Sequence, residues 1–475
     1  MQDDLRDFLK KAEDLDRLKI VKGADWDLEI GAATDLNLRR DDCPALLFDE
    51  IKGYRKGYRV LTCSASAPGL LAAILNLPKA DSDRELLNMM YEKYPQWESE
   101  IDRFDPEEVT RGPVLENVLS GDDIDLFKFP VPKWHALDGG RYMGTGDAVI
   151  TRDPDTGEVN LGTYRIQALD EKNAGFHVVP NQHGDIHRRK YHDKGEPFPI
   201  AISFGHHPLL LCMGALSIAP GTEYNLIGAI RGEPVKVIKE EVTGLPIPAD
   251  SEIVISGYCH PDKKRKEGPF GEYTGYYVTG EKERIYIEVE RVYHRNDPVL
   301  LGSPPSKPPD DAAYLLAMLR SARMYNKLKQ SGLQGINGVW FEKSTNASFF
   351  VIVSIKQHYA GHAREVALQA SLMQGKNGRY IIVVDEDINY TNLHEVLWAV
   401  CTRSDPVKDI DIMRETPSVW LDPVIHKPGL NPIVTSRAII DACKPYIRLK
   451  DFPITATVEP ETEKLVREKF KELNL

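Results

Sequence analysis

The stretch Glu267-Gly-Pro-Phe-Gly-Glu272-Tyr-Thr-Gly-Tyr276 decides how the middle of the chain folds. Its glycines and proline enforce a tight, non-helical path, which predicts a loop. The flanking residues predict strands, because Glu252-Ile-Val-Ile-Ser256 precedes the loop and Ile285, Ile287 and Val289 alternate with polar residues after it. A loop held by a rigid sheet is a common place for catalytic groups, and this one can bring its two carboxylates to one centre. The alternative is a hairpin tip with two solvated glutamates.

Length and composition describe a protein of two or three domains. At 475 residues the chain exceeds the size of a single hydrophobic core. The formal net charge of −12 excludes nucleic acid as the main partner, because a phosphate backbone attracts a basic surface. Six cysteines without a CxxC pair suit a reducing compartment, and we see no signal peptide and no apolar run of ~20 residues. We therefore expect a cytoplasmic protein that does not bind membranes.

The residue composition and the spacing of apolar residues change along the chain, which predicts an α/β (α+β) protein of four segments. Residues 1–112 carry an amphipathic helix, short strands and a charged helix, which indicates an N-terminal α/β unit. Residues 113–309 are rich in proline, glycine and short apolar runs, as in β-barrels and sandwiches. A helix capped by one of two aspartates is expected over 310–332. Residues 333–475 contain apolar runs that each precede a helical pattern, which predicts a C-terminal α/β domain.

Three polar motifs upstream of the loop supply candidate ligands. They are Asn160-Leu-Gly-Thr-Tyr-Arg165, Pro180-Asn-Gln-His183 and Pro220-Gly-Thr-Glu223. Asparagine, histidine and glutamate form a mixed oxygen and nitrogen set that suits Mg²⁺ or Mn²⁺ better than a cysteine-rich zinc site. Each residue also has an ordinary interpretation: Arg165 as a surface ion pair, His183 as a loop side chain and Glu223 as a charge at a helix N-terminus.

Two competing patterns are weaker. His183 and His187 lie four residues apart, on one face if that stretch is helical, but no HExxH motif supports zinc hydrolysis. Gly144-Thr-Gly146 is a fragment of a dinucleotide fingerprint, with Val149 where the third glycine belongs. The residues alone therefore predict an acid–base site with a bound metal and no further chemistry.

Taken together, these motifs resemble the UbiD family of reversible decarboxylases, which use prenylated flavin mononucleotide. Four motifs match that family in order: Asn160 to Arg165, Gln182-His183, Glu223 after Ala-Pro-Gly-Thr, and Glu267 to Glu272. The resemblance implies that Asn160, His183 and Glu223 bind Mn²⁺, which grips the cofactor phosphate with a potassium ion (K⁺) beside it. It also implies a split β-barrel flavin-binding domain, a linker helix and a C-terminal oligomerisation domain, assembled as a homodimer or homohexamer.

The resemblance also assigns roles to individual residues. It implies that Arg165 binds the substrate carboxylate, that Glu267 holds this arginine, and that Glu272 donates a proton to the carbon that has lost CO₂. A raised pKa at Glu272 would suit that role, and the residues expected to wall its pocket are Phe270, Tyr273 and Tyr276. The implied cofactor contacts are Thr145, Asn160, Arg165, Ile166, Gln182, His183, Gly214, Ala215, Leu216 and Glu223. A flavin prenyltransferase is the implied supplier of the cofactor.

For the substrate, the chain length and the Ser303-Pro-Pro-Ser-Lys307 segment resemble the hydroxyarene and aryl acid members of the family. We therefore expect reversible decarboxylation of a hydroxyaromatic or heteroaromatic carboxylic acid. Lys307, Lys356 and His426 are candidates to bind a phenolic hydroxyl. Two alternatives stay open: a carboxylase of an activated arene of the phenyl phosphate type, and a non-catalytic flavin-binding or assembly subunit.

Overall fold

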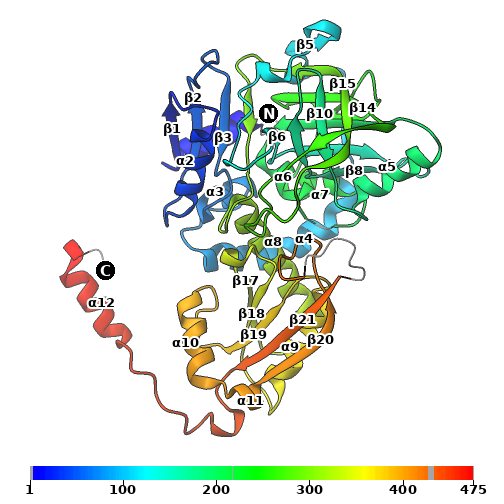
Figure 1. Cartoon of the computed structure of the whole chain (residues 1–475). Coiled ribbons are helices and arrows are strands. Elements are labelled where there is room, and N and C mark those ends of the chain that lie inside the picture. The colour runs from blue at the N-terminus through cyan, green and yellow to red at the C-terminus, as the bar shows by residue number, and fades with distance from the viewer. Residues whose placement is uncertain (1–3, 217, 426–432, 474–475) are drawn as a thin grey trace.

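The structure is a computed structural model that describes residues 4–216, 218–425 and 433–473. Figure 1 shows two bodies, one built by the N-terminal and central parts of the chain and one by the C-terminal sheet, with the long helix α8 (Asp311–Gln330) between them. This architecture confirms the predicted α/β fold class. The domain boundaries at residues 112, 309 and 332 stay predictions.

A four-stranded sheet organises the N-terminal unit. Its elements are α1 (Leu5–Asp14), β1 (Leu18–Lys22), α2 (Glu29–Leu38), β2 (Ala45–Asp49), β3 (Arg59–Thr62), α3 (Pro68–Ile74) and β16 (Val299–Leu301). The strand order is β1-β2-β3-β16, so the last strand comes from far along the chain and pairs in parallel with β3. The central part of the chain therefore returns to complete this sheet.

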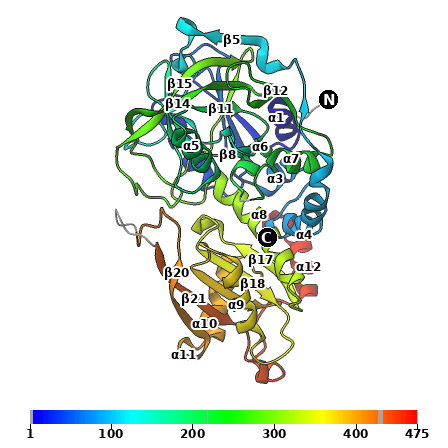
Figure 2. The same cartoon turned by 90° about the vertical axis from the view of Figure 1, so that its right-hand side faces the viewer.

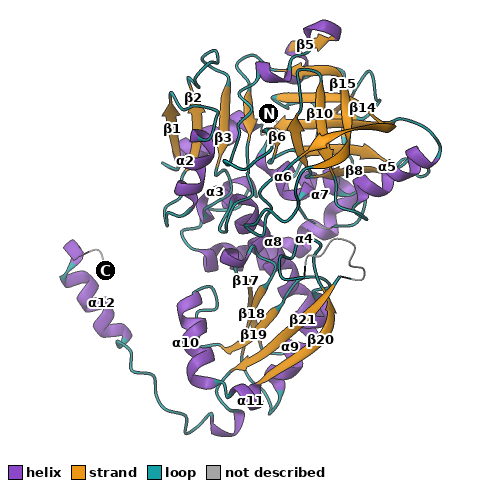
Figure 3. Ribbon diagram, viewed as in Figure 1, coloured by secondary structure: helices purple, strands orange, loops and turns teal. Residues whose placement is uncertain are grey.

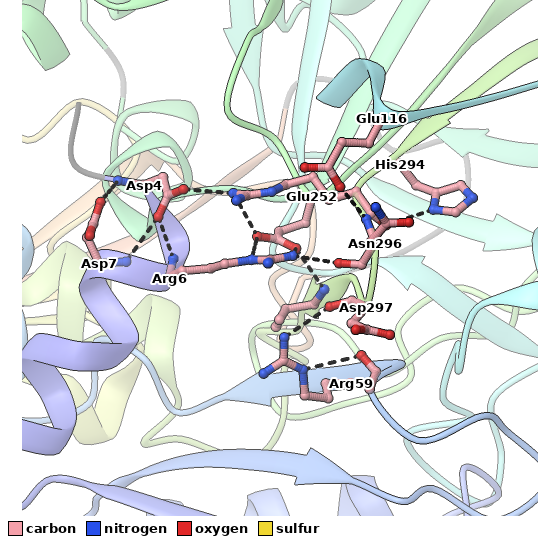
Figure 4. Close-up of polar contacts among 12 residues, drawn as sticks. Asp4, Arg6, Asp7, Arg59, Glu116, Glu252, His294, Asn296 and Asp297 are labelled. Atoms are coloured by element: carbon pink, nitrogen blue, oxygen red, sulfur yellow. Dashed lines mark hydrogen bonds and ion pairs between the residues drawn. The ribbon is translucent and has the colours of Figure 1, made fainter. Parts of the chain in front are cut away.

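Ion pairs around one buried carboxylate, that of Glu252, tie α1 to the central domain (Figure 4). Arg6 on α1 donates from Nε and Nη2 to the two carboxylate oxygens of Glu252, at 2.8 and 2.9 Å. Glu252 is fully buried and also contacts Arg295 at 3.1 Å, while Arg295 contacts Asp4, the N-cap of α1, at 2.7 Å. Because removing one partner of a buried charge network leaves the other charge uncompensated, these pairs hold the N-terminal unit firmly against the central domain.

An antiparallel nine-stranded sheet forms the split barrel (Figure 3). Its strands are β5 (Asn117–Ser120), β6 (Arg141–Gly144), β7 (Ala148–Arg152), β8 (Val159–Gly162), β9 (Arg165–Ala168), β10 (Asn173–His177), β11 (Phe198–Gly205), β14 (Ile253–Glu267) and β15 (Lys282–His294). The order is β6-β9-β10-β15-β14-β11-β7-β8, with β5 added to β15. The long strands β14 and β15 form a hairpin, and residues 268–281 between them contain most of the loop predicted from the sequence.

Helices and a small sheet complete the central part of the chain. They are α4 (Asp83–Glu100), α5 (His183–Asp193), α6 (Pro208–Gly214), α7 (Glu223–Arg231), β4 (Glu107–Glu108), β12 (Lys236–Lys239) and β13 (Pro246–Pro248). Helix α4 packs against α8 at the junction between the two bodies, where Tyr91 stacks on Tyr325 with ring centroids 3.9 Å apart. Helix α8 begins as predicted, because the Asp310 side chain accepts a hydrogen bond from the Ala313 N–H at 2.7 Å.

The C-terminal domain contains a five-stranded sheet of order β17-β18-β19-β21-β20. Its elements are β17 (Ile336–Phe341), β18 (Phe350–Ile355), α9 (His362–Met373), β19 (Tyr380–Asp385), α10 (Leu393–Arg403), α11 (Pro406–Asp409), β20 (Ile410–Pro417) and β21 (Val434–Ala442). Strands β18 and β19 are runs of Val and Ile, as expected of parallel strands that are buried on both faces. The last helix, α12 (Pro460–Lys469), stands away from the sheet in the view of Figure 1 and lies behind the molecule in the turned view of Figure 2. None of the described helices has both the length and the apolar character needed to cross a bilayer.

Candidate active site

An arginine held by two carboxylates lies at the base of the β14–β15 loop. Arg165, the first residue of β9, donates from Nε and Nη2 to the two oxygens of Glu267 at 2.9 and 2.8 Å. Its Nη1 contacts Glu272 Oε1 at 2.5 Å. All three side chains are buried, so the structure brings together the three residues predicted to be catalytic. The alternative of two solvated glutamates at a hairpin tip is wrong.

Burial gives Glu272 an unusual proton affinity. The pKa of Glu272 is raised, because the loss of solvation around the carboxyl group outweighs the opposing effect of the Arg165 guanidinium. The Phe270 ring lies 5.5 Å from the Arg165 guanidinium carbon and 4.1 Å from the Tyr142 ring, so it forms one apolar wall. Tyr276 does not belong to this wall, since 60% of its side chain is exposed, which corrects the expectation from the sequence. A carboxyl group in these surroundings can act as a proton donor near neutral pH.

Hydrogen bonds from three other elements fix the loop. The Gln167 side-chain oxygen accepts from the Gly268 N–H at 3.1 Å, and Asp138 accepts from the Tyr277 hydroxyl at 2.9 Å. Asn346, from the C-terminal domain, donates to the Tyr273 carbonyl. A loop anchored at its beginning, middle and end holds its carboxylates in place, and this preorganisation is what acid–base chemistry requires.

A second set of predicted residues lines one cavity of about 280 Å³. The predicted residues along its walls are Asn160, Gln182, His183, Gly214, Ala215, Leu216 and Glu223. The cavity therefore lies where β8, the start of α5, the end of α6 and the start of α7 meet. His183 Nδ1 lies 3.0 Å from Asn160 Oδ1, and Glu223 is 4% exposed. Burial raises the pKa of Glu223 to about 7, well above the usual value of a glutamate carboxyl group.

Three predicted cofactor residues do not line this cavity: Arg165, which contacts the two glutamates, Thr145 and Ile166. Thr145 is buried and its hydroxyl oxygen accepts from the Ser303 N–H at 3.0 Å. Ile166 is buried in the hydrophobic core of the barrel, directly after Arg165. All three stay predictions as cofactor contacts.

The part of the chain that the structure describes contains no ligand set for the alternative zinc site on His183 and His187. His187 directs Nδ1 to the Thr151 hydroxyl at 3.0 Å and Nε2 toward Asp153 at 3.8 Å, whereas His183 contacts Asn160. No group of three or more histidine, cysteine, aspartate or glutamate side chains is placed to hold a metal among these residues. A site built on Asn160, His183 and Glu223 contains only two side chains of those types and takes its third donor from an amide.

The residues predicted to bind a phenolic hydroxyl lie in different places. Lys307 borders the loop, because a Cβ added at Gly275 would lie 3.0 Å from the Lys307 Cα. Lys356 is exposed at the end of β18, and its N–H donates to the Gly335 carbonyl at 2.8 Å. His426 lies outside the described residues.

Sequence reasoning missed one charged neighbour of the site, Arg284. Its Nε lies 3.0 Å from Glu267 Oε2, the oxygen that also accepts from Arg165 Nη2. The sequence does contain a signal, since Lys282-Glu-Arg284 begins a strand of alternating pattern directly after the loop. The pattern cannot say which carboxylate that arginine reaches, because this depends on the register of the hairpin.

Comparison with known proteins agrees with the geometry. Models of the 3-octaprenyl-4-hydroxybenzoate carboxy-lyase match the chain in order: the N-terminal domain over residues 7–90, the Rift-related domain over 107–308 and the C-terminal domain over 313–442. A phenolic acid decarboxylase of Sedimentibacter hydroxybenzoicus is 31% identical over 462 residues, which cover 93% of this chain and 92% of the relative. The fold and the comparisons thus define a decarboxylase, an enzyme of the carboxy-lyase class. The chain belongs to the UbiD family.

Solved structures share the fold over the full length of the chain. The open form of vanillic acid decarboxylase from Sedimentibacter hydroxybenzoicus superposes with a TM-score of 0.84 at 31% identity and covers 99% of both chains. The UbiD-class enzyme HmfF from Pelotomaculum thermopropionicum, solved in complex with FMN, has a TM-score of 0.85 at 27% identity and covers 98% of this chain and 100% of that chain. An evolved dimeric form of HmfF was solved in complex with prFMN.

Proposed function

We propose that this protein catalyses the reversible, non-oxidative decarboxylation of an aromatic carboxylic acid, with prenylated FMN, Mn²⁺ and K⁺ as cofactors. The observation that carries the proposal is the buried contact of Arg165 with both Glu267 and Glu272. The decarboxylase relatives and the flavin complexes of HmfF support it. A degenerate, non-catalytic subunit has no need to retain all three of these side chains, so we favour an enzyme.

The cavity at the start of α7 fits the proposed metal and flavin phosphate. Asn160 Nδ2 is buried without a hydrogen-bond partner among the described residues. Glu223 is buried, and no cation pairs with it in the part of the chain that the structure describes. An amide oxygen, an imidazole and a carboxylate form a donor set suited to Mn²⁺, and a bound cation would supply the charge that Glu223 lacks. We propose Asn160, His183 and Glu223 as the ligands.

The chain's own residues orient the substrate and move the proton. When bound, the prenylated flavin supplies the electron sink for the reaction. The Nη1 and Nη2 groups of Arg165 each retain an N–H beyond those used by the glutamates, and these can hold the substrate carboxylate. The bond between the ring carbon and the carboxyl carbon breaks, CO₂ leaves, and Glu272 transfers its proton to the ring carbon. Solvent then returns a proton to Glu272, and carboxylation runs the same steps in reverse.

The proposed substrate is a hydroxyaromatic or heteroaromatic acid. Lys307 borders the Glu272 loop, so its ammonium group is the described candidate that can approach a ring hydroxyl. The proposed partners are a flavin prenyltransferase, which supplies the cofactor, and further copies of this chain in a homodimer or homohexamer. We propose a cytoplasmic location.

The test is production of the holoenzyme by co-expression with a flavin prenyltransferase. We expect a coloured protein that releases a flavin heavier than FMN by one five-carbon unit, contains equimolar Mn²⁺ and releases CO₂ from hydroxybenzoates or furoates. A cinnamate-only activity would contradict the substrate class. A fully loaded protein without turnover on any aromatic acid would contradict the proposed function.

A further inference from the structure

Glu267 lies between two guanidinium groups. Arg165 contacts both of its oxygens, at 2.9 and 2.8 Å, and Arg284 approaches Oε2 at 3.0 Å. The Glu267 side chain is 1% exposed and that of Arg284 is 20% exposed, so this second pair is largely shielded from water. Glu272 differs, because among the residues that the structure describes it forms an ion pair with Arg165 alone. The two carboxylates of the site are therefore held unequally.

The register of the sheet explains how Arg284 reaches this position. Tyr286 of β15 pairs with Gly175 of β10, and paired residues of antiparallel strands project to the same face. Gly175 leaves the room that Glu267 occupies, since a Cβ added at this glycine would lie 3.1 Å from Glu267 Cγ. Arg284 precedes Tyr286 by two residues and so projects to that same face. The hairpin that supplies Glu267 from β14 thus also supplies its second arginine from β15.

The charged and titratable groups around Glu267 come from five parts of the fold. They are Tyr142 of β6, Arg165 of β9, His177 of β10, Glu272 of the loop, and Lys282 and Arg284 of β15. Burial, Arg165 and Arg284 hold the pKa of His177 well below its usual value, so this imidazole adds no charge. Two arginines repel each other unless an anion lies between them, and Glu267 is that anion.

We propose that Arg284 is a positioning residue: it shares Glu267 with Arg165, fixes the Arg165 guanidinium against Glu272, and leaves Glu272 as the carboxyl group that exchanges the proton. Two parallel hydrogen bonds fix the Glu267 carboxylate relative to Arg165, and Arg284 restrains this pair as a whole from a second strand. The inference rests on the proposed function, since it takes Glu272 as the proton donor.

The test compares Arg284→Leu with a matched control, Arg291→Leu, in the cofactor-loaded enzyme. Arg291 lies on the same strand and pairs with a glutamate in the same way, Nε to Glu241 Oε1 at 2.7 Å, but outside the site. We expect Arg284→Leu to lower kcat/KM about 10-fold, through both a higher KM and a lower kcat, because Arg165 loses its fixed orientation. Arg291→Leu should leave both constants unchanged. Arg284→Lys, which keeps the charge, should recover part of the loss.

A second readout does not depend on turnover. In the protein without cofactor, the infrared band of a protonated carboxyl group that disappears in Glu272→Gln reports the titration of Glu272. Arg284 is one of the groups that lower the pKa of Glu272, so Arg284→Leu should move this titration to higher pH, by about half a unit. Arg284→Lys should titrate like the wild type. A role limited to stability would not move this midpoint.

The possible outcomes separate this inference from the proposed function. If the wild type decarboxylates, Glu272→Gln does not, and Arg284→Leu keeps wild-type kinetics and titration, the role of Arg284 is wrong while the proposed function stands. If the loaded wild type is inactive or Glu272→Gln retains turnover, the proposed function itself is wrong. Should Arg284→Leu fail to fold, Arg284→Gln retains a polar side chain at the same position. The kinetic constants and the Glu272 titration of that variant then test the role of Arg284.

Discussion

Asn160, the second residue of β8, and Arg165, the first residue of β9, lie on the two strands joined by one short connection, and they serve two different parts of the site. Asn160 faces the cavity shared with His183 and Glu223, whereas Arg165 faces the glutamates of the β14–β15 loop. A single short connection therefore sets the spacing between the proposed metal site and the proposed proton donor. A molecule that bridges the two must match that spacing, and we propose that the flavin does so.

Replacing His183 by alanine should release the metal and, with it, the flavin. The substitution removes the imidazole of the proposed ligand set and leaves an amide and a carboxylate that bind Mn²⁺ weakly. We expect Mn²⁺ and flavin content to fall at least about 10-fold in the purified protein, as measured by elemental analysis and absorbance.

His192→Ala is the matched control, because His192 lies on the same helix and contacts the Cys259 carbonyl outside the cavity. Equal loss of metal from both variants would show that His183 acts only through the stability of α5.

Replacing Gly175 by alanine should damage the site without unfolding the protein. The new methyl group would lie 3.1 Å from Glu267 Cγ and would displace the carboxylate that orients Arg165. We expect kcat to fall about 10-fold with little change in the thermal midpoint. Gly280→Ala is the control, since a Cβ at Gly280, in the same loop region, meets no atom within 4 Å. Unchanged kcat in Gly175→Ala would contradict the positioning of Arg165 by Glu267.

Asp311 should lose its stabilising contribution to the fold as the pH rises from about 4 to about 7. Burial and the neighbouring Asp310 raise the pKa of Asp311 from 3.8 to about 7. The folded state therefore binds this proton more tightly than the unfolded state, so the stabilisation is complete below about pH 4 and is lost as the pH passes about 7. The loss reaches up to roughly 4 kcal/mol.

Asp311→Asn removes this titration, so its unfolding free energy should depend less on pH than that of the wild type. Denaturant titrations at several pH values measure the unfolding free energies of the wild type and of Asp311→Asn. The Asp310 carboxyl group, whose pKa burial raises to about 6, stays in both proteins and leaves a smaller slope. Parallel curves for the two proteins would contradict the assignment to Asp311.

Local patterns predicted much of the fold. The apolar stretch at 252–256 identified the beginning of β14, alternation identified β15, and the aspartate before an apolar helix identified the start of α8. Local patterns could not predict that residues 299–301 return to the N-terminal sheet as β16. That pairing joins segments more than two hundred residues apart, and nothing in three apolar residues specifies a partner.

In the site, too, local patterns predicted some residues, whereas contacts between distant strands could not be predicted. The Glu267–Glu272 spacing indicated a pair of carboxylates, but the arrival of Arg165 between them depends on β9 and β14, which are about a hundred residues apart. The family resemblance supplied that contact before the structure did. Arg284 belongs to no motif, and only the hairpin register reveals it.

The most direct test of the central claim is CO₂ release by the loaded wild type and by loaded Glu272→Gln, on a panel of hydroxybenzoates and furoates at matched flavin and Mn²⁺ content. The amide keeps the shape of the side chain and cannot donate the proton, so we predict turnover in the wild type and a loss of at least about 100-fold in the variant. Glu283→Gln, an exposed glutamate on β15, should behave like the wild type. Turnover retained in Glu272→Gln would contradict the claim that Glu272 protonates the product.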